Sequence, residues 1–188
     1  MTNKMKKELE LYIHIPFCVR KCAYCDFRSA PAGREVQAQY VARLLEEIQK
    51  AAPLAEDYEV VSAFFGGGTP SILPEEEIGR VMDLLHQQFD WRADAEVTIE
   101  ANPGTVDGRK LDAYRSFGMN RISFGLQSAD NEELRRLGRI HTWEQFLESY
   151  EAARTAGFTN INVDLMSALP GQTLKSWQET LQKVLALT

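Results

Sequence analysis

The sequence predicts an α/β fold in which parallel strands are joined by helices. Short β-prone runs alternate with longer segments of helical apolar spacing, and this alternation repeats five times along the chain. Such alternation is typical of a parallel sheet with helical crossovers. The length of 188 residues suits one domain with its own hydrophobic core.

Strands are expected where β-branched and aromatic residues cluster between turn-forming residues. Five such runs are predicted as strands, at residues 11–15, 60–65, 96–100, 121–126 and 161–165. The segments between them carry apolar residues three and four positions apart, as on the buried face of a helix. Helices are therefore predicted at residues 35–52, 74–89 and 111–117, from 130, from 142 to about 157, and from 173 onward.

The starts of the last three helices carry capping signals. Asp130 with Glu133 resembles a capping box, and Thr142 with Gln145 fits one directly. Thr173 is expected to cap the last helix through its hydroxyl oxygen.

Composition and charge exclude several classes of protein. With 44% hydrophobic and 26% charged residues, the chain is expected to be folded and soluble. The net charge of −6 gives no electrostatic reason to expect binding to DNA or RNA. No apolar stretch approaches the ~20 residues of a membrane span, and residues 1–10 lack the apolar part of a secretory signal.

All three cysteines fall in one CxxxCxxC run, as Cys18, Cys22 and Cys25. Thiols bunched in this way do not form a disulfide framework, so they indicate metal ligation in a reducing cytoplasm. A [4Fe–4S] cluster held by protein alone takes four cysteines, and three leave one iron open for chemistry. The alternatives are a zinc site with His14 as fourth ligand, for which the spacing is unusual, or free thiols.

The residues around these cysteines resemble a known cluster loop. The run from Tyr12 to Cys25 reads Tyr-x-His-Ile-Pro-Phe-Cys-x-x-x-Cys-x-Tyr-Cys. It is similar to radical S-adenosylmethionine (SAM) proteins, specifically the oxygen-independent coproporphyrinogen III oxidases and their heme chaperone relatives. The resemblance implies a partial TIM-like (β/α) barrel with about five of six βα units. It also implies that SAM chelates the open iron, receives one electron and yields a 5′-deoxyadenosyl radical.

The resemblance extends to motifs after the other strands. Gly67, Gly68 and Thr69, in a Gly-Gly-Gly-Thr-Pro run after the second strand, are expected to hold the methionine end of SAM. Glu100 ends the third strand, where its carboxylate can accept both ribose hydroxyls. Because these motifs and the cysteines follow their strands, they are expected on the carboxyl-end face that carries active sites in α/β barrels.

Five further positions correspond to SAM contacts in the family. They are Tyr12, Tyr24, Gln127, Arg139 and Asp164. The last three correspond to residues that contact a second SAM molecule in the oxidases. Asp164 lies in an apolar run, where a carboxylate is costly without a partner, so it is expected to face a ligand or a paired cation. Beyond the cluster itself, no residue is assigned a catalytic role.

One position separates the two branches of the family. The oxidase pattern is CxxxCxxCxC, and Phe27 stands where its fourth cysteine would be. The chaperone relatives commonly read Cys-Asp-Phe, as this chain does. The favoured hypothesis is therefore a heme chaperone that passes heme to acceptor proteins. The alternatives are a coproporphyrinogen dehydrogenase-type oxidoreductase that decarboxylates propionates, and a structural metal protein without SAM chemistry.

The chain ends directly after a helix, where a parallel βα array would continue with another strand. We therefore expect residues 1–188 to be a radical SAM core that is truncated at its C-terminal end and lacks the family's C-terminal domain. Its open edge is expected to be exposed or to form dimer contacts. The expected partners are SAM, heme or a porphyrin in the full-length protein, and an unidentified heme acceptor and electron donor.

Overall fold

Five parallel strands form one sheet in the order of the sequence, β1-β2-β3-β4-β5. The computed structural model describes residues 6–187. The strands are β1 (Lys7–Ile15), β2 (Tyr58–Gly67), β3 (Trp91–Ala101), β4 (Arg121–Gln127) and β5 (Asn160–Leu165). The predicted α/β fold with a parallel sheet is confirmed.

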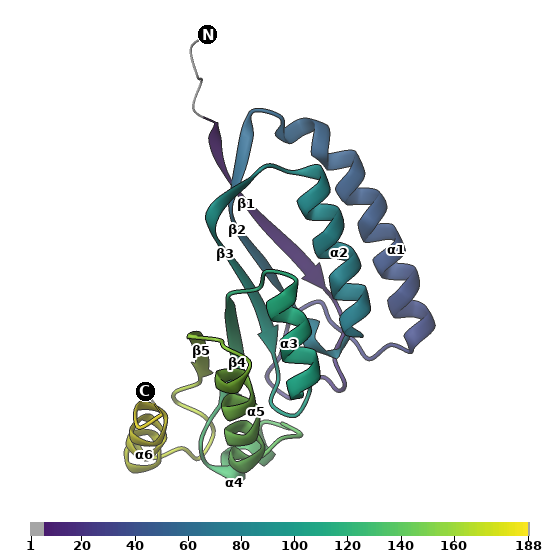
Figure 1. Cartoon of the computed structure of the whole chain (residues 1–188). Coiled ribbons are helices and arrows are strands. Elements are labelled where there is room, and N and C mark those ends of the chain that lie inside the picture. Colours follow the sequence, from purple (N-terminus) through teal and green to yellow (C-terminus); the bar gives the residue numbers. More distant parts are fainter. Residues whose placement is uncertain (1–5, 188) are drawn as a thin grey trace.

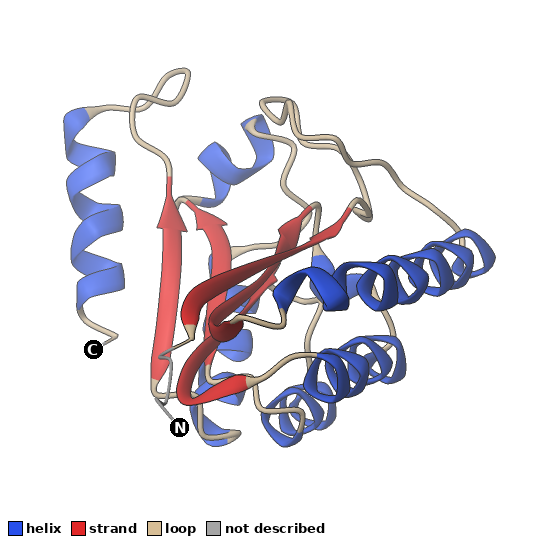
Figure 2. Cartoon of the chain, turned by 90° about the horizontal axis from the view of Figure 1, so that it is seen from above, coloured by secondary structure: helices blue, strands red, loops and turns tan. Residues whose placement is uncertain are grey.

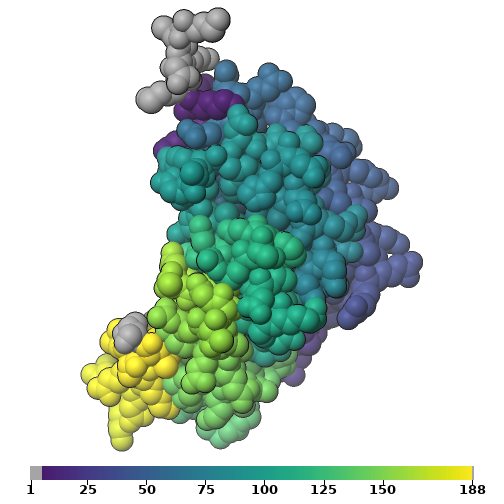
Figure 3. Space-filling view, viewed as in Figure 1, coloured from purple at the N-terminus to yellow at the C-terminus, as the bar shows by residue number. Residues whose placement is uncertain are grey.

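A helical connection joins each strand to the next (Figure 1). The helices are α1 (Arg34–Ala51), α2 (Glu75–Gln88), α3 (Gly108–Ser116), α4 (Asn131–Arg136), α5 (Trp143–Thr155) and α6 (Leu174–Leu185). Two 3₁₀ turns, Ala52–Ala55 and Pro70–Ile72, complete the connections. Successive βα units lie beside one another, so the sequence colours cross the surface in bands (Figure 3). Among the described residues, no helix is long and apolar enough to cross a membrane.

All five strands are longer than predicted, and three of them by more than one residue. β1 begins at Lys7 rather than at residue 11, and its first residue pairs with Tyr58 of β2. β3 begins at Trp91, which pairs with Val60 ahead of a register shift. β2 continues through Gly67, into the glycines that were expected to end it. Backbone pairing between strands extends each of these elements into segments whose side chains carry a weak β signal.

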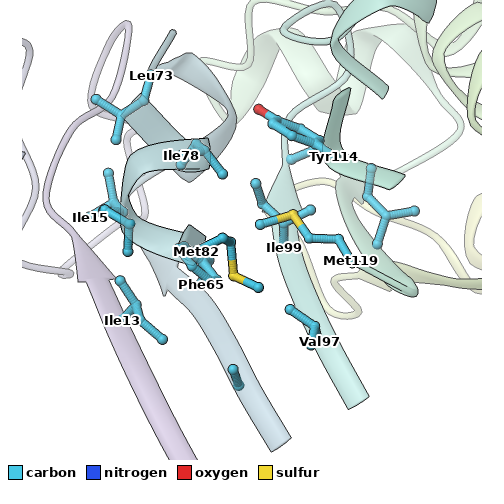
Figure 4. Close-up of a cluster of buried hydrophobic side chains, with 14 of the residues drawn as sticks. Ile13, Ile15, Phe65, Leu73, Ile78, Met82, Val97, Ile99, Tyr114 and Met119 are labelled. Carbon is cyan, nitrogen blue, oxygen red and sulfur yellow. The ribbon is translucent and has the colours of Figure 1, made fainter. Parts of the chain in front are cut away.

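One face of the sheet forms the hydrophobic core. Ile15, Phe65, Ile99 and Ile122 occupy neighbouring strands and are fully buried. Met82 of helix α2 belongs to the same buried cluster and lies beside Phe65 (Figure 4). Each fully buried side chain of this size contributes about 1.5–3 kcal/mol. The opposite face is polar, so the core fixes the sheet from one side while the other side remains available to a ligand.

The start of α4 only partly follows the prediction. The Asp130 side chain accepts hydrogen bonds from the backbone N–H groups of Glu132 and Glu133, so it caps the helix. A capping box would also have the Glu133 carboxylate accept from the Asp130 N–H. That part of the prediction is wrong, because the carboxylate is buried and accepts from other groups. It accepts from the side chains of Ser128 (2.6 Å), Ser176 (2.8 Å) and Gln172 (2.9 Å). The capping boxes at Thr142 and Thr173 are confirmed.

Glu133 thereby fastens the last helix to the rest of the chain. Ser176 belongs to α6, which lies beside β5 at the end of the sheet (Figures 1 and 2). One turn further along α6, Thr180 Oγ1 accepts from the Ala129 N–H at 3.2 Å. Thr180 is the buried residue of this helix. Polar contacts therefore carry much of the attachment of α6.

Glu133→Ala should lower the free energy of unfolding by about 3 kcal/mol, because the buried Ser128 hydroxyl and the partly buried Ser176 and Gln172 side chains all lose this acceptor. Urea denaturation measures this loss. Glu132→Ala is the matched control, since Glu132 is exposed and, within residues 6–187, its side chain pairs only with Arg135 on the surface. The control should change stability by about 0.5 kcal/mol or less. Equal losses in the two variants would contradict the role given to Glu133.

Candidate functional site

The strand-end motifs meet around one cavity of ≈ 330 Å³. All strands point the same way, and the loops that follow them gather beyond the arrowheads (Figure 2). Every predicted site residue except Tyr12 lines this cavity: Cys18, Cys22, Tyr24, Cys25, Gly67, Gly68, Thr69, Glu100, Gln127, Arg139 and Asp164. Asn102, which sequence reasoning treated only as part of a turn, lines it too.

The cysteine loop is closed at its base by backbone hydrogen bonds. Phe17 forms an isolated parallel bridge with Ala30, and the Cys18 N–H donates to the Ala30 carbonyl at 3.2 Å. Inside the loop, the Cys25 N–H donates to the Cys22 carbonyl at 3.1 Å and forms a tight turn. All three cysteines are free and partly exposed. The chain therefore presents three thiols on one short, anchored loop.

The glycine turn packs directly against the base of this loop. A Cβ on Gly68 would lie 2.5 Å from the Phe17 carbonyl oxygen. A Cβ on Gly67 would lie 2.6 Å from the His14 ring, and Gly67 has a φ of 113°, which other residues rarely adopt. The Gly68 N–H donates to the Ile15 carbonyl at 2.8 Å. These glycines thus allow β2 to lie against the cysteine loop, a structural reason for the motif beyond ligand approach.

Glu100 is hydrogen-bonded to the glycine turn and lies near the carboxylate of Asp164 in β5. Its Oε2 accepts a hydrogen bond from the Gly67 N–H at 3.1 Å. Burial raises the pKa of Glu100, the nearby Asp164 charge adds to this rise, and the Gly67 hydrogen bond opposes it. Oε1 accepts no hydrogen bond from the described residues, so one carboxylate oxygen remains for a hydroxyl donor.

Asp164 is exposed on the polar face of the sheet. Its carboxylate accepts from Asn162 Nδ2 at 2.7 Å and from Ser123 Oγ at 3.3 Å. The expected alternative of a paired cation is wrong within the described chain, because its partners there are neutral donors. The carboxylate lines the cavity, as the ligand-facing alternative requires.

Gln127 is held in an unusual backbone conformation. Its φ is 74°, in the left-handed region that residues other than glycine seldom adopt. The Met166 N–H donates to its carbonyl at 2.9 Å, which joins the end of β4 to the segment after β5. A Cβ on Gly125 would come within 3.1 Å of Gln127 Nε2. Gly125 therefore leaves room for the Gln127 side chain.

Arg139 reaches the cysteine loop from the segment after α4. Its Nη1 donates to Cys22 Sγ at 3.6 Å, and its Nη2 donates to Asn102 Oδ1 at 2.6 Å and to the Gly125 carbonyl. Its Nε is buried and has no acceptor among the described residues. The Arg139 guanidinium thus lies beside one of the three predicted ligand thiols.

The two tyrosines lie differently. Tyr24 lines the cavity, and burial raises its pKa to about 12, with a smaller opposing effect from Arg139. Tyr12 lies outside the cavity lining and is 60% exposed, with its ring stacked on Phe64 at 6.1 Å. Burial, followed by the Glu100 charge, raises its pKa. Tyr12 is therefore placed next to the cavity.

The histidines have structural contacts. His14 Nε2 lies 3.4 Å from the Arg28 carbonyl, and the ring fills the space left by Gly67. His141 is buried with Nε2 3.3 Å from the Leu126 carbonyl, and burial lowers its pKa to about 4. No three His, Cys, Asp or Glu side chains of residues 6–187, the three cysteines included, are arranged around a metal position, so this geometry does not separate a zinc site from a cluster.

The donor set fits an iron–sulfur cluster with an open iron. Three free thiols face one cavity, and two of them receive hydrogen bonds: Cys22 from Arg139 and Cys18 from Thr69 Oγ1 at 3.7 Å. Thiolates are the usual cluster ligands, and hydrogen bonds to their sulfur atoms tune the cluster. Convergence of the three sulfur atoms on one metal position stays a prediction.

Comparisons with known proteins agree with this donor set. Residues 12–184 match the family model of the radical SAM superfamily. The chain is 42% identical to the heme chaperone HemW of Escherichia coli over 180 residues, covering 95% of this chain and 48% of the relative. It is 39% identical to HemW of Haemophilus influenzae over 185 residues, covering 96% and 48%. It is 38% identical to the oxygen-independent coproporphyrinogen III oxidase of Salmonella typhimurium over 183 residues, covering 97% and 40%.

A solved structure gives the same result for the fold. The coproporphyrinogen III oxidase HemN from Escherichia coli, described as a radical SAM enzyme, matches with a TM-score of 0.91 and 36% identity. The match covers 100% of this chain and 43% of that one. The predicted partial barrel is thereby confirmed, and the chain spans about half the length of the curated relatives it matches.

Gly68→Ala should displace the cysteine loop, because the new Cβ meets backbone that cannot move alone. We expect a loss of about 1–3 kcal/mol in the free energy of unfolding, together with reduced iron uptake under anaerobic reconstitution. Gly108→Ala is the control, since a Cβ there meets nothing within 4 Å. It should leave both stability and iron uptake near wild type. Normal iron uptake by Gly68→Ala would contradict the packing role of the glycine turn.

Proposed function

Because residues 12–184 match its family model, the chain belongs to the radical SAM superfamily, and we propose that it is part of a heme chaperone. Membership implies a [4Fe–4S] cluster and SAM as cofactors. The observation that carries the assignment of these cofactors is the meeting of three thiols with Gly67, Gly68, Thr69 and Glu100 around one cavity. When bound, the cluster and SAM together supply one-electron cleavage of the sulfonium bond.

The chain's own residues bind and orient these groups. Cys18, Cys22 and Cys25 would hold three irons, while the glycine turn and Thr69 would receive the methionine end of SAM. Glu100 would accept the ribose hydroxyls through the carboxylate oxygen that Gly67 leaves unpaired. Tyr12, Tyr24, Gln127, Arg139 and Asp164 remain proposed SAM contacts, the last three for a second molecule.

The chaperone branch is favoured by Phe27. This residue lines the cavity and is 69% exposed, where the oxidase pattern has a fourth cysteine. Heme transfer, the heme acceptor and the electron donor are proposed for the whole protein. This chain spans about half the length of its heme chaperone relatives. A cytoplasmic location is part of the proposal, since clustered thiols require a reducing compartment.

The second candidate is an oxygen-independent coproporphyrinogen III oxidase. The structural match with a TM-score of 0.91 to such an enzyme favours it, and sequence identities of 42% and 38% to the two branches do not separate them. In this alternative, the same cavity would serve hydrogen abstraction from propionate side chains.

Replacing Cys18, Cys22 or Cys25 with Ala should abolish cluster assembly, because each removes one of three ligands. Anaerobically reconstituted wild type should be brown and hold about four irons per chain, measured by iron analysis and absorption spectroscopy. Val19→Ala is the control, since Val19 lies inside the loop and is 58% exposed. It should keep the full cluster. A colourless zinc protein, or a full cluster in any single-Ala variant, would contradict the ligand assignment.

The full-length protein should bind heme, pass it to an acceptor and leave coproporphyrinogen III unchanged. Reconstituted full-length protein is incubated with SAM, a reductant and coproporphyrinogen III, and vinyl products are measured by mass spectrometry. Heme binding is followed by absorption. Robust propionate loss would reject the chaperone proposal in favour of the oxidase, whereas the Cys variants test the cluster independently of this outcome.

A further inference from the structure

We propose that Asn102 is a positioning residue that sets the hydrogen bonds received by two cluster-binding thiolates. This inference rests on the proposed function, because it concerns the same cysteines. Asn102 follows the last residue of β3 and is half-buried. It lines the cavity that the three cysteines border and also a small neighbouring cavity that borders Cys22. Its side chain therefore lies between the glycine turn and the cysteine loop.

The Asn102 side chain joins two groups that each reach a cysteine. Its Nδ2 donates to Thr69 Oγ1 at 2.9 Å, and its Oδ1 accepts from Arg139 Nη2 at 2.6 Å. Thr69 Oγ1 in turn donates to Cys18 Sγ at 3.7 Å, and Arg139 Nη1 donates to Cys22 Sγ at 3.6 Å. One amide thus connects the hydrogen-bond donors of both sulfur atoms.

The chemistry of the partners fixes the direction of every bond. A guanidinium can only donate, so the Asn102 atom facing Arg139 is the carbonyl oxygen. The amide nitrogen must then face Thr69, and the Thr69 hydroxyl accepts from it. Because Thr69 accepts this bond, its hydroxyl does not donate to Asn102, and its one proton can point at Cys18. Without Asn102, nothing in this chain of bonds would orient the Thr69 proton toward the sulfur.

The surroundings hold the amide in place. The backbone carbonyl of Asn102 accepts from the Thr105 N–H at 3.1 Å and from Thr105 Oγ1 at 2.7 Å. These two bonds fix the turn that carries the side chain. On the other side, a Cβ on Gly125 would lie 3.0 Å from Asn102 Oδ1 and 3.3 Å from Arg139 Nη2. A glycine in β4 therefore leaves the space in which Asn102 and Arg139 meet.

Hydrogen bonds to thiolate sulfur stabilise the more negative, reduced state of a cluster and raise its reduction potential. Loss of the Asn102 amide should remove the oriented donor at Cys18 and loosen the one at Cys22. The cluster should then become harder to reduce. This consequence differs from that of a residue that only supports the fold.

The test compares reduction potentials of the reconstituted full-length protein, measured by redox titration with electron paramagnetic resonance. Asn102→Ala should shift the potential to a lower value. Asn120→Ala is the matched control, since the Asn120 amide likewise joins two groups, here backbone ones: it donates to the Ala95 carbonyl and accepts from the Val97 N–H, both at 2.8 Å. The control should cost stability without a shift in potential. Equal shifts in both variants, or none in Asn102→Ala, would overturn the inference.

Variants of Thr69 keep the test decisive if Asn102→Ala fails to fold or to hold iron. Thr69→Val should lower the potential, and Thr69→Ser, which keeps the hydroxyl, should restore it. Where Asn102→Ala does hold a cluster, its Cys18 has already lost the oriented hydrogen bond. Adding Thr69→Val should then lower the reduction potential no further, so the shifts of the two single variants should not add. A Thr69→Val potential equal to wild type, or fully additive shifts, would contradict the relay.

The outcome also separates this inference from the proposed function. A wild-type protein that assembles a four-iron cluster, combined with unchanged potentials in the Asn102 and Thr69 variants, rejects only the relay. A wild-type protein that takes up no iron overturns both.

Discussion

The close approach of two backbone segments underlies the whole site. Gly67 and Gly68 lie against His14 and the Phe17 carbonyl, at distances where any Cβ would collide. This contact sets the glycine turn at the base of the cysteine loop, and Gly67 then reaches Glu100 across the sheet. A parallel sheet brings all its carboxyl ends to one edge, but the absence of two side chains is what allows the ends of β1 and β2 to merge into one site.

The motifs and their location could be predicted from the sequence because they are local. The cysteine spacing, the glycine run and the strand-end position of Glu100 each lie within a few residues, and the parallel fold brings them together. What could not be predicted depends on contacts between distant segments. Lys7 belongs to β1 because it pairs with Tyr58 of β2. The Glu133 carboxylate does not cap its own helix but accepts a hydrogen bond from Ser176, 43 residues away. No local pattern carries that information.

Asn102 illustrates the same limit inside the site. Its sequence context, Asn-Pro-Gly after a strand, indicates a turn, and the structure does contain that turn. Its link between Thr69 and Arg139 spans 33 residues in one direction and 37 in the other. The left-handed conformation of Gln127 is equally hidden, because nothing in a Gly-Leu-Gln-Ser run distinguishes it from ordinary extended backbone.

Helix α6 is attached mainly by polar contacts, so the free energy of local unfolding should differ between this end of the sheet and the rest of the chain. Elements held by apolar burial, such as strands β1–β4 with their buried side chains, can open only by exposing large hydrophobic surface. Helix α6 buries Thr180 and relies on Glu133 contacts, so water can replace many of the interactions it loses. Local unfolding should therefore begin at this end of the sheet, and β5 with α6 would form a separate, less stable cooperative unit beside a firmer cluster-binding half.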